Sequence, residues 1–209
     1  RLEYYTSLNL LEKSASDLSI TDTNGLDRFK NGILVDAFTG HNVGNVLSNE
    51  YHIAIDPIAK EIGAVNTIVF KNNKSIGYNT DAFGFKQSIK PFLTNKHDCA
   101  LIFGTGGAAK AVAFVLKEIG IKVLYVSRKA NGSKNHFAYT DVNENMLSAC
   151  KLLVNCTPLG MFPKTEISVD IPFDALGKEH LVIDLIYNPD KTLFLERAQK
   201  QHATILNGA

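Results

Sequence analysis

Residues 103–111 read Phe103-Gly104-Thr105-Gly106-Gly107-Ala108-Ala109-Lys110-Ala111, and this stretch decides the fold. It follows an apolar segment, 99–103, and opens a helical pattern that continues to about residue 119. A strand that turns at glycines into a helix is typical of dinucleotide-binding domains: glycine lets the backbone approach a pyrophosphate, and the amino end of the helix favours an anion. The third glycine comes earlier than in the standard fingerprint, so the prediction depends on the strand–turn–helix context.

Strand and helix patterns alternate along the second half of the chain. Apolar runs predict strands at 122–127, 152–154, 181–185 and 203–206, and the periodicity of 107–119 and 191–201 predicts helices. Strands that alternate with helices form parallel sheets that are covered on both faces. We therefore predict a Rossmann-like, doubly wound α/β domain over residues 93–209.

The first half of the chain has a different pattern. Residues 4–8 and 33–35 predict strands, and Pro57 begins a short helix that Gly63 ends. Residues 66–70 and 75–78 predict two strands joined by a hairpin-like turn, and a helix is expected over 81–92. We interpret residues 1–92 as an N-terminal α/β substrate-binding lobe, with cofactor and substrate meeting in a cleft between the lobes.

Composition excludes several classes of function. The chain has 209 residues, of which 45% are hydrophobic, and its net charge of +1 provides no basic field for nucleic acid or a membrane surface. The longest apolar runs are too short to span a bilayer, and nothing at the start resembles a signal peptide. The three cysteines have no metal-type spacing, which predicts no metal site and fits a reducing cytoplasm. Two of them lie in apolar runs, where a cysteine behaves as a small hydrophobe. The composition allows a monomer or a homodimer.

The second predicted strand of this domain ends in Ser127-Arg128-Lys129. An enzyme that uses NAD usually places an acidic residue here to bind the ribose 2′-hydroxyl, whereas cations suit the 2′-phosphate of NADP. The sequence thus predicts NADP as the cofactor. The alternative interpretation is an exposed basic turn without a ligand.

Two further groups of residues suit a ligand site. The loop 155–163 follows a buried strand and contains two prolines and a glycine, a stiff composition that could fix a nicotinamide ring or form a purely structural turn. Asn66 and Asp81 lie at the ends of adjoining elements, where polar side chains can bind the hydroxyls of a polyol-like substrate. Alternatively, Asp81 only caps a helix.

Five blocks together resemble the shikimate dehydrogenase family over about residues 51–208. They are Gly63-Ala64-Val65-Asn66-Thr67, Gly77-Tyr78-Asn79-Thr80-Asp81, Gly104-Thr105-Gly106-Gly107-Ala108, Asn155-Cys156-Thr157-Pro158-Leu159-Gly160-Met161 and Asp184-Leu185-Ile186-Tyr187-Asn188-Pro189. Asn207-Gly208 looks like the start of that family's next block. This resemblance implies a cytoplasmic oxidoreductase of chorismate and aromatic amino-acid biosynthesis, which reversibly reduces 3-dehydroshikimate to shikimate with NADPH.

The resemblance also implies roles for individual residues. Asn66 and Asp81 should bind the substrate hydroxyls, Asp81 should act in catalysis beside a lysine, and Tyr187 should contact substrate near the nicotinamide. The cofactor should be held at its pyrophosphate by Gly104, Thr105, Gly106, Gly107 and Ala108, at its 2′-phosphate by Ser127 and Arg128, and at its nicotinamide half by Thr157, Leu185 and Gly208.

One position departs from the family pattern. Asn45 falls where the family carries its catalytic lysine, and an amide neither takes nor gives the proton. Two other interpretations therefore stay open. One is a non-catalytic NADP-binding homologue, and the other is a quinate or shikimate-type polyol dehydrogenase.

Overall fold

A computed structural model describes residues 32–35, 54–71 and 74–208. The chain divides into two compact units, Arg1–Asp81 and Ala82–Ala209, which are described separately below. The predicted strand at 4–8 lies outside the described residues. The predicted lobe boundaries, 1–92 and 93–209, stay a prediction.

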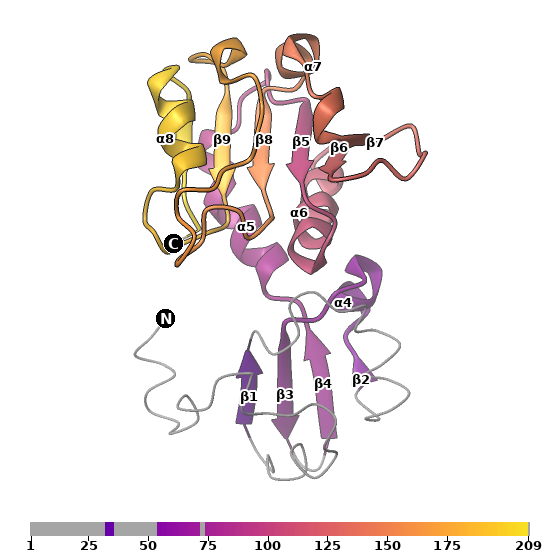
Figure 1. Cartoon of the computed structure of the whole chain (residues 1–209). Helices are drawn as coiled ribbons and strands as arrows, with labels where there is room; N and C mark the ends of the chain where they lie inside the picture. The colour runs from indigo at the N-terminus through magenta and orange to yellow at the C-terminus, as the bar shows by residue number, and fades with distance from the viewer. Residues whose placement is uncertain (1–31, 36–53, 72–73, 209) are drawn as a thin grey trace. The chain divides into compact units, whose positions relative to one another are not determined.

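The first unit contains a four-stranded sheet in the order β1-β3-β4-β2 (Figure 1). Its elements are β1 (Gly32–Val35), β2 (Ala54–Ile55), α4 (Pro57–Ile62), β3 (Thr67–Lys71) and β4 (Lys74–Tyr78). The predicted pair of strands is confirmed, because β3 and β4 run antiparallel. Asp56 caps α4 by accepting hydrogen bonds from the backbone N–H groups of Ile58 and Ala59, and Gly63 ends it with φ 71°.

The second unit contains a six-stranded sheet in the order β10-β9-β8-β5-β6-β7, and every neighbouring pair is parallel. The strands are β5 (Cys99–Phe103), β6 (Lys122–Ser127), β7 (His136–Ala138), β8 (Leu152–Asn155), β9 (Leu181–Asp184) and β10 (Thr204–Leu206). The helices are α5 (Asp81–Ile89), whose first residue belongs to the first unit, α6 (Gly107–Glu118), α7 (Glu144–Ala149) and α8 (Leu193–Lys200). Turns of 3₁₀ helix lie at Lys90–Phe92, Tyr139–Asp141 and Phe173–Ala175. The strand order reverses between β5 and β8, as in doubly wound folds.

Helices cover both faces of this sheet (Figure 1). All five residues of β5 are buried. Leu101 and Phe103 pack in one core with residues of α7 and α8, and the intervening Ala100 and Ile102 point to the other face. The predicted Rossmann-like α/β fold is confirmed. Strand β7 lies in a stretch for which the sequence predicted no strand.

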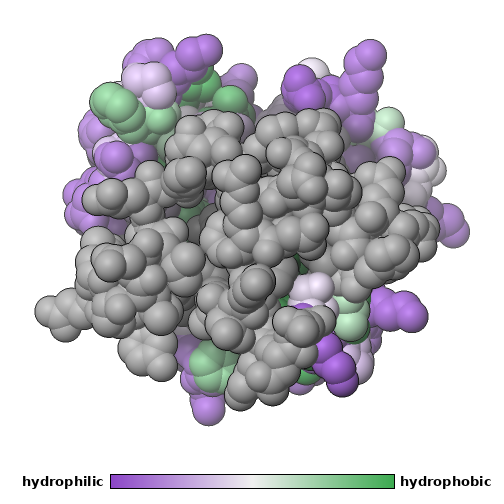
Figure 2. Space-filling view, turned by 90° about the horizontal axis from the view of Figure 1, so that it is seen from below, coloured by the Kyte–Doolittle hydropathy of each residue, from purple (hydrophilic) through white to green (hydrophobic). Residues whose placement is uncertain are grey.

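One view of the surface shows both hydrophilic and hydrophobic residues. In Figure 2 the margin of the molecule is mainly hydrophilic, with smaller hydrophobic patches between. Exposed ion pairs such as Lys86–Glu118, with 2.9 Å between Nζ and Oε1, contribute little to stability. Among the described helices, none has both the length and the apolar character that crossing a membrane requires.

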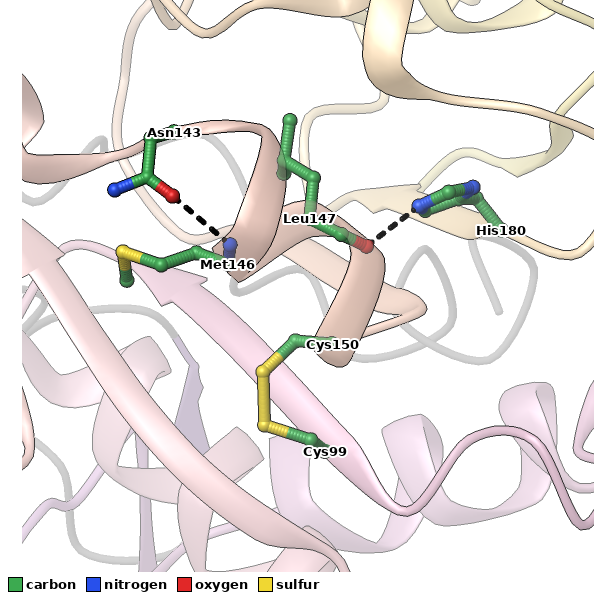
Figure 3. The surroundings of a disulfide bond; sticks show 6 residues. All are labelled: Cys99, Asn143, Met146, Leu147, Cys150 and His180. Atoms are coloured by element: carbon green, nitrogen blue, oxygen red, sulfur yellow. Dashed lines mark hydrogen bonds between the residues drawn. A yellow bond between two sulfur atoms is a disulfide. The ribbon is translucent and has the colours of Figure 1, made fainter.

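Two of the three cysteines are joined. Cys99 and Cys150 are buried and form a disulfide that the sequence did not predict (Figure 3). They are 51 residues apart in the sequence, and their Cα atoms lie 4.5 Å apart because β5 and β8 are neighbours. Cys156 is a free cysteine. The reducing compartment inferred from the cysteines stays a prediction.

His180 is a buried histidine that is bonded through both ring nitrogens. Its Nε2 lies 2.9 Å from the carbonyl oxygen of Leu147 (Figure 3), and its Nδ1 accepts a hydrogen bond of 3.0 Å from the backbone N–H of Gly177. The neutral ring with its proton on Nε2 satisfies both contacts. Burial lowers the pKa of His180 below its ordinary value of 6.5.

Because the pKa of His180 is lowered in the folded protein, we expect the protein to become less stable in acid. As the pH falls, the unfolded chain takes up the imidazole proton first, so the free energy of unfolding decreases below the ordinary pKa and continues to decrease towards the lower folded pKa. We expect the urea midpoint to decrease between about pH 7.5 and 5.5 in the wild type, and to decrease less in His180→Gln. The exposed His202→Gln serves as control and should keep the wild-type slope. An identical slope in His180→Gln would contradict the assignment.

Candidate nucleotide and substrate site

The glycine loop begins directly after β5. Gly104 has φ 106°, and a Cβ there would lie 3.2 Å from the carbonyl oxygen of Cys156. The backbone N–H of Gly104 donates to the carbonyl oxygen of Val126 in β6, at 2.8 Å. Only glycine adopts this conformation without strain, and the contact with the loop after β8 leaves little room for a side chain.

The amino end of α6 suits an anion. Gly106 is the N-cap residue and makes no side-chain capping bond, the first turn contains no acidic residue, and Gly107 and Ala108 follow it. A Cβ at Gly106 would meet nothing within 4 Å. Thr105 and Gly106 are exposed. Uncapped N–H groups at the positive end of a 12-residue helix, with open space in front, fit a pyrophosphate.

The basic turn lies at the same edge of the sheet as the glycine loop. Phe103 pairs with Val126, so Ser127 at the end of β6 is adjacent to the start of the loop. Arg128 and Lys129 are exposed. Cations beside the glycine loop fit the adenosine 2′-phosphate of NADP.

The loops after β8 and β9 complete this edge. Thr157 donates through its backbone N–H and its hydroxyl to Asn155 Oδ1, at 3.0 and 2.7 Å, and its methyl carbon faces Gly104. The backbone N–H of Leu185 donates to the Asn155 carbonyl oxygen at 3.1 Å. A Cβ at Gly208 would overlap the Leu185 carbonyl. The structure thus brings together Gly104, Thr157, Leu185 and Gly208, and their role in one cofactor site stays a prediction from the resemblance.

A buried polar network holds these two loops, and the sequence reasoning missed its function. Asp184 is fully buried and accepts three hydrogen bonds: from Asn155 Nδ2 at 3.0 Å, from the Ile186 backbone N–H at 3.1 Å and from the Thr192 hydroxyl at 2.6 Å. Burial raises the pKa of the Asp184 carboxyl. The sequence signal for this network is that each of the two apolar strands ends in a polar residue, Asn155 or Asp184.

Tyr187 follows this network along the chain. Its side chain is 73% exposed, whereas the preceding Ile186 is buried. The backbone around it is anchored, because the carbonyl oxygen of Asn188 accepts a hydrogen bond from the Phe162 N–H at 3.2 Å. An exposed phenol on an anchored loop can contact a ligand, and the substrate contact that the resemblance implies for Tyr187 stays a prediction.

Asn66 and Asp81 lie together in the first unit. The Asn66 amide donates to Asp81 Oδ1 at 2.6 Å and to the Thr80 hydroxyl at 3.2 Å. Its own oxygen accepts from the Thr80 backbone N–H at 2.9 Å and the Thr67 hydroxyl at 3.1 Å, so the amide orientation is fixed. Asn66 is buried and Asp81 is exposed, which leaves the pair accessible from one side. Asn45 lies outside the described residues.

Taken together, a doubly wound sheet with a glycine loop and a basic turn at one edge defines a dinucleotide-binding protein of the Rossmann type. No family model matches the chain. The shikimate dehydrogenase (NADP(+)) of Methanosphaera stadtmanae is 36% identical over 169 residues, which are 74% of this chain and 60% of that protein. The chain is therefore similar to shikimate dehydrogenases over 74% of its length, and the predicted resemblance is confirmed.

Solved structures agree with the sequence comparison. The shikimate dehydrogenase of Aquifex aeolicus has a TM-score of 0.71 at 28% identity, with 94% of this chain and 73% of that chain covered. The Thermus thermophilus enzyme, solved with NADP(H) and shikimate, has a TM-score of 0.70 at 28% identity and the same coverage. The chain spans about three fifths of the length of the curated relatives it matches.

Proposed function

We propose that the protein is an NADP-dependent shikimate dehydrogenase, which reversibly reduces 3-dehydroshikimate to shikimate in chorismate and aromatic amino-acid biosynthesis. The observation that carries the proposal is the Asn66–Asp81 pair, a fixed amide that orients an accessible carboxylate at 2.6 Å. The curated relatives bear this name. NADPH supplies the hydride that reduces the ketone.

Asn66 and Asp81 form the substrate side of the proposal. Thr80 and Thr67 hold the Asn66 oxygen, so the amide N–H points at the Asp81 carboxylate and fixes its direction. Both side chains bind substrate hydroxyls, and Asp81 assists transfer of the proton that accompanies the hydride. Tyr187 contacts the substrate near the nicotinamide.

The cofactor is held by residues of the second unit. The loop of Gly104, Thr105, Gly106, Gly107 and Ala108 binds the pyrophosphate at the amino end of α6. Ser127 and Arg128 bind the 2′-phosphate of NADP. Thr157, Leu185 and Gly208 border the nicotinamide half.

The proposal is tested by mixing the protein with shikimate and NADP⁺ and following the absorbance of reduced cofactor. Asp81→Asn should lower kcat by about 10²- to 10⁴-fold, because a neutral amide cannot exchange the proton, and should leave the affinity for NADP unchanged. Asp56→Asn is the control, since asparagine also caps a helix. Full activity in Asp81→Asn would sink the assignment. Quinate is included as a second substrate.

A second candidate is a non-catalytic NADP-binding homologue. The observation that favours it is Asn45 in the position of the family's catalytic lysine. If this candidate is right, calorimetry should detect NADP binding, Arg128→Ala should weaken it, and no polyol should be oxidised. Activity restored by Asn45→Lys would instead assign the defect to that residue alone. The cytoplasmic location and the choice between monomer and homodimer stay predictions from the sequence.

A further inference from the structure

A histidine on the edge strand β7 lies against the basic turn. His136 is paired with Tyr125 in the parallel register of β6 and β7, and its Nε2 lies 2.7 Å from the hydroxyl oxygen of Ser127. Tyr125 and Ser127 are two residues apart on one strand and therefore share a face of the sheet. The imidazole packs edge-on against the Tyr125 ring, with centroids 6.3 Å apart, so His136 covers this face beside the end of β6.

The direction of the hydrogen bond follows from counting protons. The Ser127 hydroxyl has one proton, which it donates to the carbonyl oxygen of Lys129 at 2.9 Å. The bond to His136 must then be donated by the imidazole N–H at Nε2. The result is a continuous chain of hydrogen bonds from His136 through Ser127 to the Lys129 carbonyl.

This chain of hydrogen bonds shapes the turn that carries Arg128. The bond from the Ser127 side chain to the Lys129 carbonyl closes a turn of three residues with Arg128 at its centre, and Arg128 is exposed there. A guanidinium binds a phosphate through two N–H groups in a fixed geometry, so its affinity depends on how the backbone presents it.

We propose that His136 is a positioning residue for recognition of the cofactor's 2′-phosphate, acting through Ser127 on the turn that presents Arg128. The inference rests on the proposed NADP dependence and deepens it. NAD lacks the 2′-phosphate, so its affinity does not depend on the chain of hydrogen bonds from His136 through Ser127. The chain of hydrogen bonds through Ser127 thus discriminates between the two cofactors from β7, which pairs with β6.

Two small probes isolate the 2′-phosphate. Adenosine 2′,5′-bisphosphate and 5′-AMP differ only in that group, and their dissociation constants are measured by calorimetry on the full chain. His136→Leu should weaken the bisphosphate about three- to tenfold, the effect of one lost hydrogen bond, and leave 5′-AMP within about twofold. His136→Gln, whose amide can donate to Ser127, should retain most of the bisphosphate affinity. Thermal unfolding checks that both variants fold.

A double-mutant cycle tests whether His136 acts through Ser127. Ser127→Ala alone should weaken the bisphosphate, and adding His136→Leu should change the affinity by less than about 1.5-fold. The inference is overturned if His136→Leu leaves the ratio of the two dissociation constants, bisphosphate to 5′-AMP, unchanged. It is also overturned if His136→Leu weakens bisphosphate binding as much in the Ser127→Ala background as in the wild type.

Activity measurements separate this inference from the proposed function. If the wild type oxidises shikimate with NADP⁺ and His136→Leu leaves the probe ratio unchanged, the inference alone fails. If His136→Leu weakens the bisphosphate relative to 5′-AMP as expected while no shikimate is oxidised, the inference about His136 holds and the proposed activity fails.

Discussion

Asp184→Ala is expected to destabilise the nucleotide-binding unit by about 3–5 kcal/mol, the largest effect of any single substitution considered in this protein. The change leaves the Asn155 amide, the Ile186 N–H and the Thr192 hydroxyl buried without their acceptor. Each orphaned buried group costs about 1–3 kcal/mol, part of which is recovered by relaxation. The free energy of unfolding of a typical domain is only about 5–15 kcal/mol, so the variant should unfold at a much lower urea concentration than the wild type.

Two further variants show which property of Asp184 matters. In Asp184→Asn the remaining oxygen still accepts from Asn155, and the new amide can donate to the Thr192 hydroxyl, so a loss of only about 1 kcal/mol is expected. Asp174→Ala is the matched control: its carboxylate accepts from Gln201 at 3.1 Å but is exposed, and its loss should stay within about 0.5 kcal/mol. Equal urea midpoints for Asp184→Ala and Asp174→Ala would refute the structural role.

Substitution of two neighbouring glycines should separate folding from cofactor binding. Gly104→Ala should cost about 2 kcal/mol of stability, because its φ of 106° is unfavourable for any side chain and a Cβ would crowd the Cys156 carbonyl. NADP binding should weaken with it. Gly106→Ala should cost less, about 0.5–1 kcal/mol, since its φ is −76° and a Cβ there meets nothing, so only the poorer N-cap preference of alanine remains.

Gly106→Ala should nevertheless weaken NADP at least about tenfold, because the added methyl group occupies space that the pyrophosphate needs. Urea unfolding and calorimetry on the same samples give the two readouts. Gly177→Ala is the control glycine: a Cβ there also meets nothing within 4 Å, and it precedes β9 at the opposite edge of the sheet, so neither quantity should change. Wild-type affinity in Gly106→Ala would mean that this loop does not hold the pyrophosphate.

The strands and helices around the glycine loop could be predicted because their signals are local. Cys99–Phe103 is apolar throughout, as a strand buried on both faces must be, and the periodicity of α6 is plain in its residues. Strand β7 could not be predicted, because His136–Ala138 has only three residues and follows a polar loop. It becomes a strand only by pairing with β6.

The parts of the site that depend on distant pairing were not visible in the sequence. The two distant partners of Asp184 are Asn155 in β8 and Thr192 at the start of α8. Only the register of β8 with β9 shows that Asn155 meets Asp184. Asn66 and Asp81, 15 residues apart, could be named as candidates, while their hydrogen bond depends on the β3–β4 hairpin. Local patterns identify which residues are polar at strand ends, and tertiary structure decides which of them touch.

The disulfide gives the nucleotide-binding unit an unusual connectivity. Cys99 opens β5 and Cys150 ends α7 just before β8, so the bond turns β5, α6, β6, β7 and α7 into a covalent ring. In the chain-entropy description, closing a loop of this length raises the free energy of the unfolded chain by about 4 kcal/mol. The closure lies at the amino ends of the two central strands, and the ligand loops leave from their carboxyl ends. The redox state of the surroundings therefore sets how readily this unit unfolds, and the bond lies at the opposite ends of these strands from the proposed nucleotide loops.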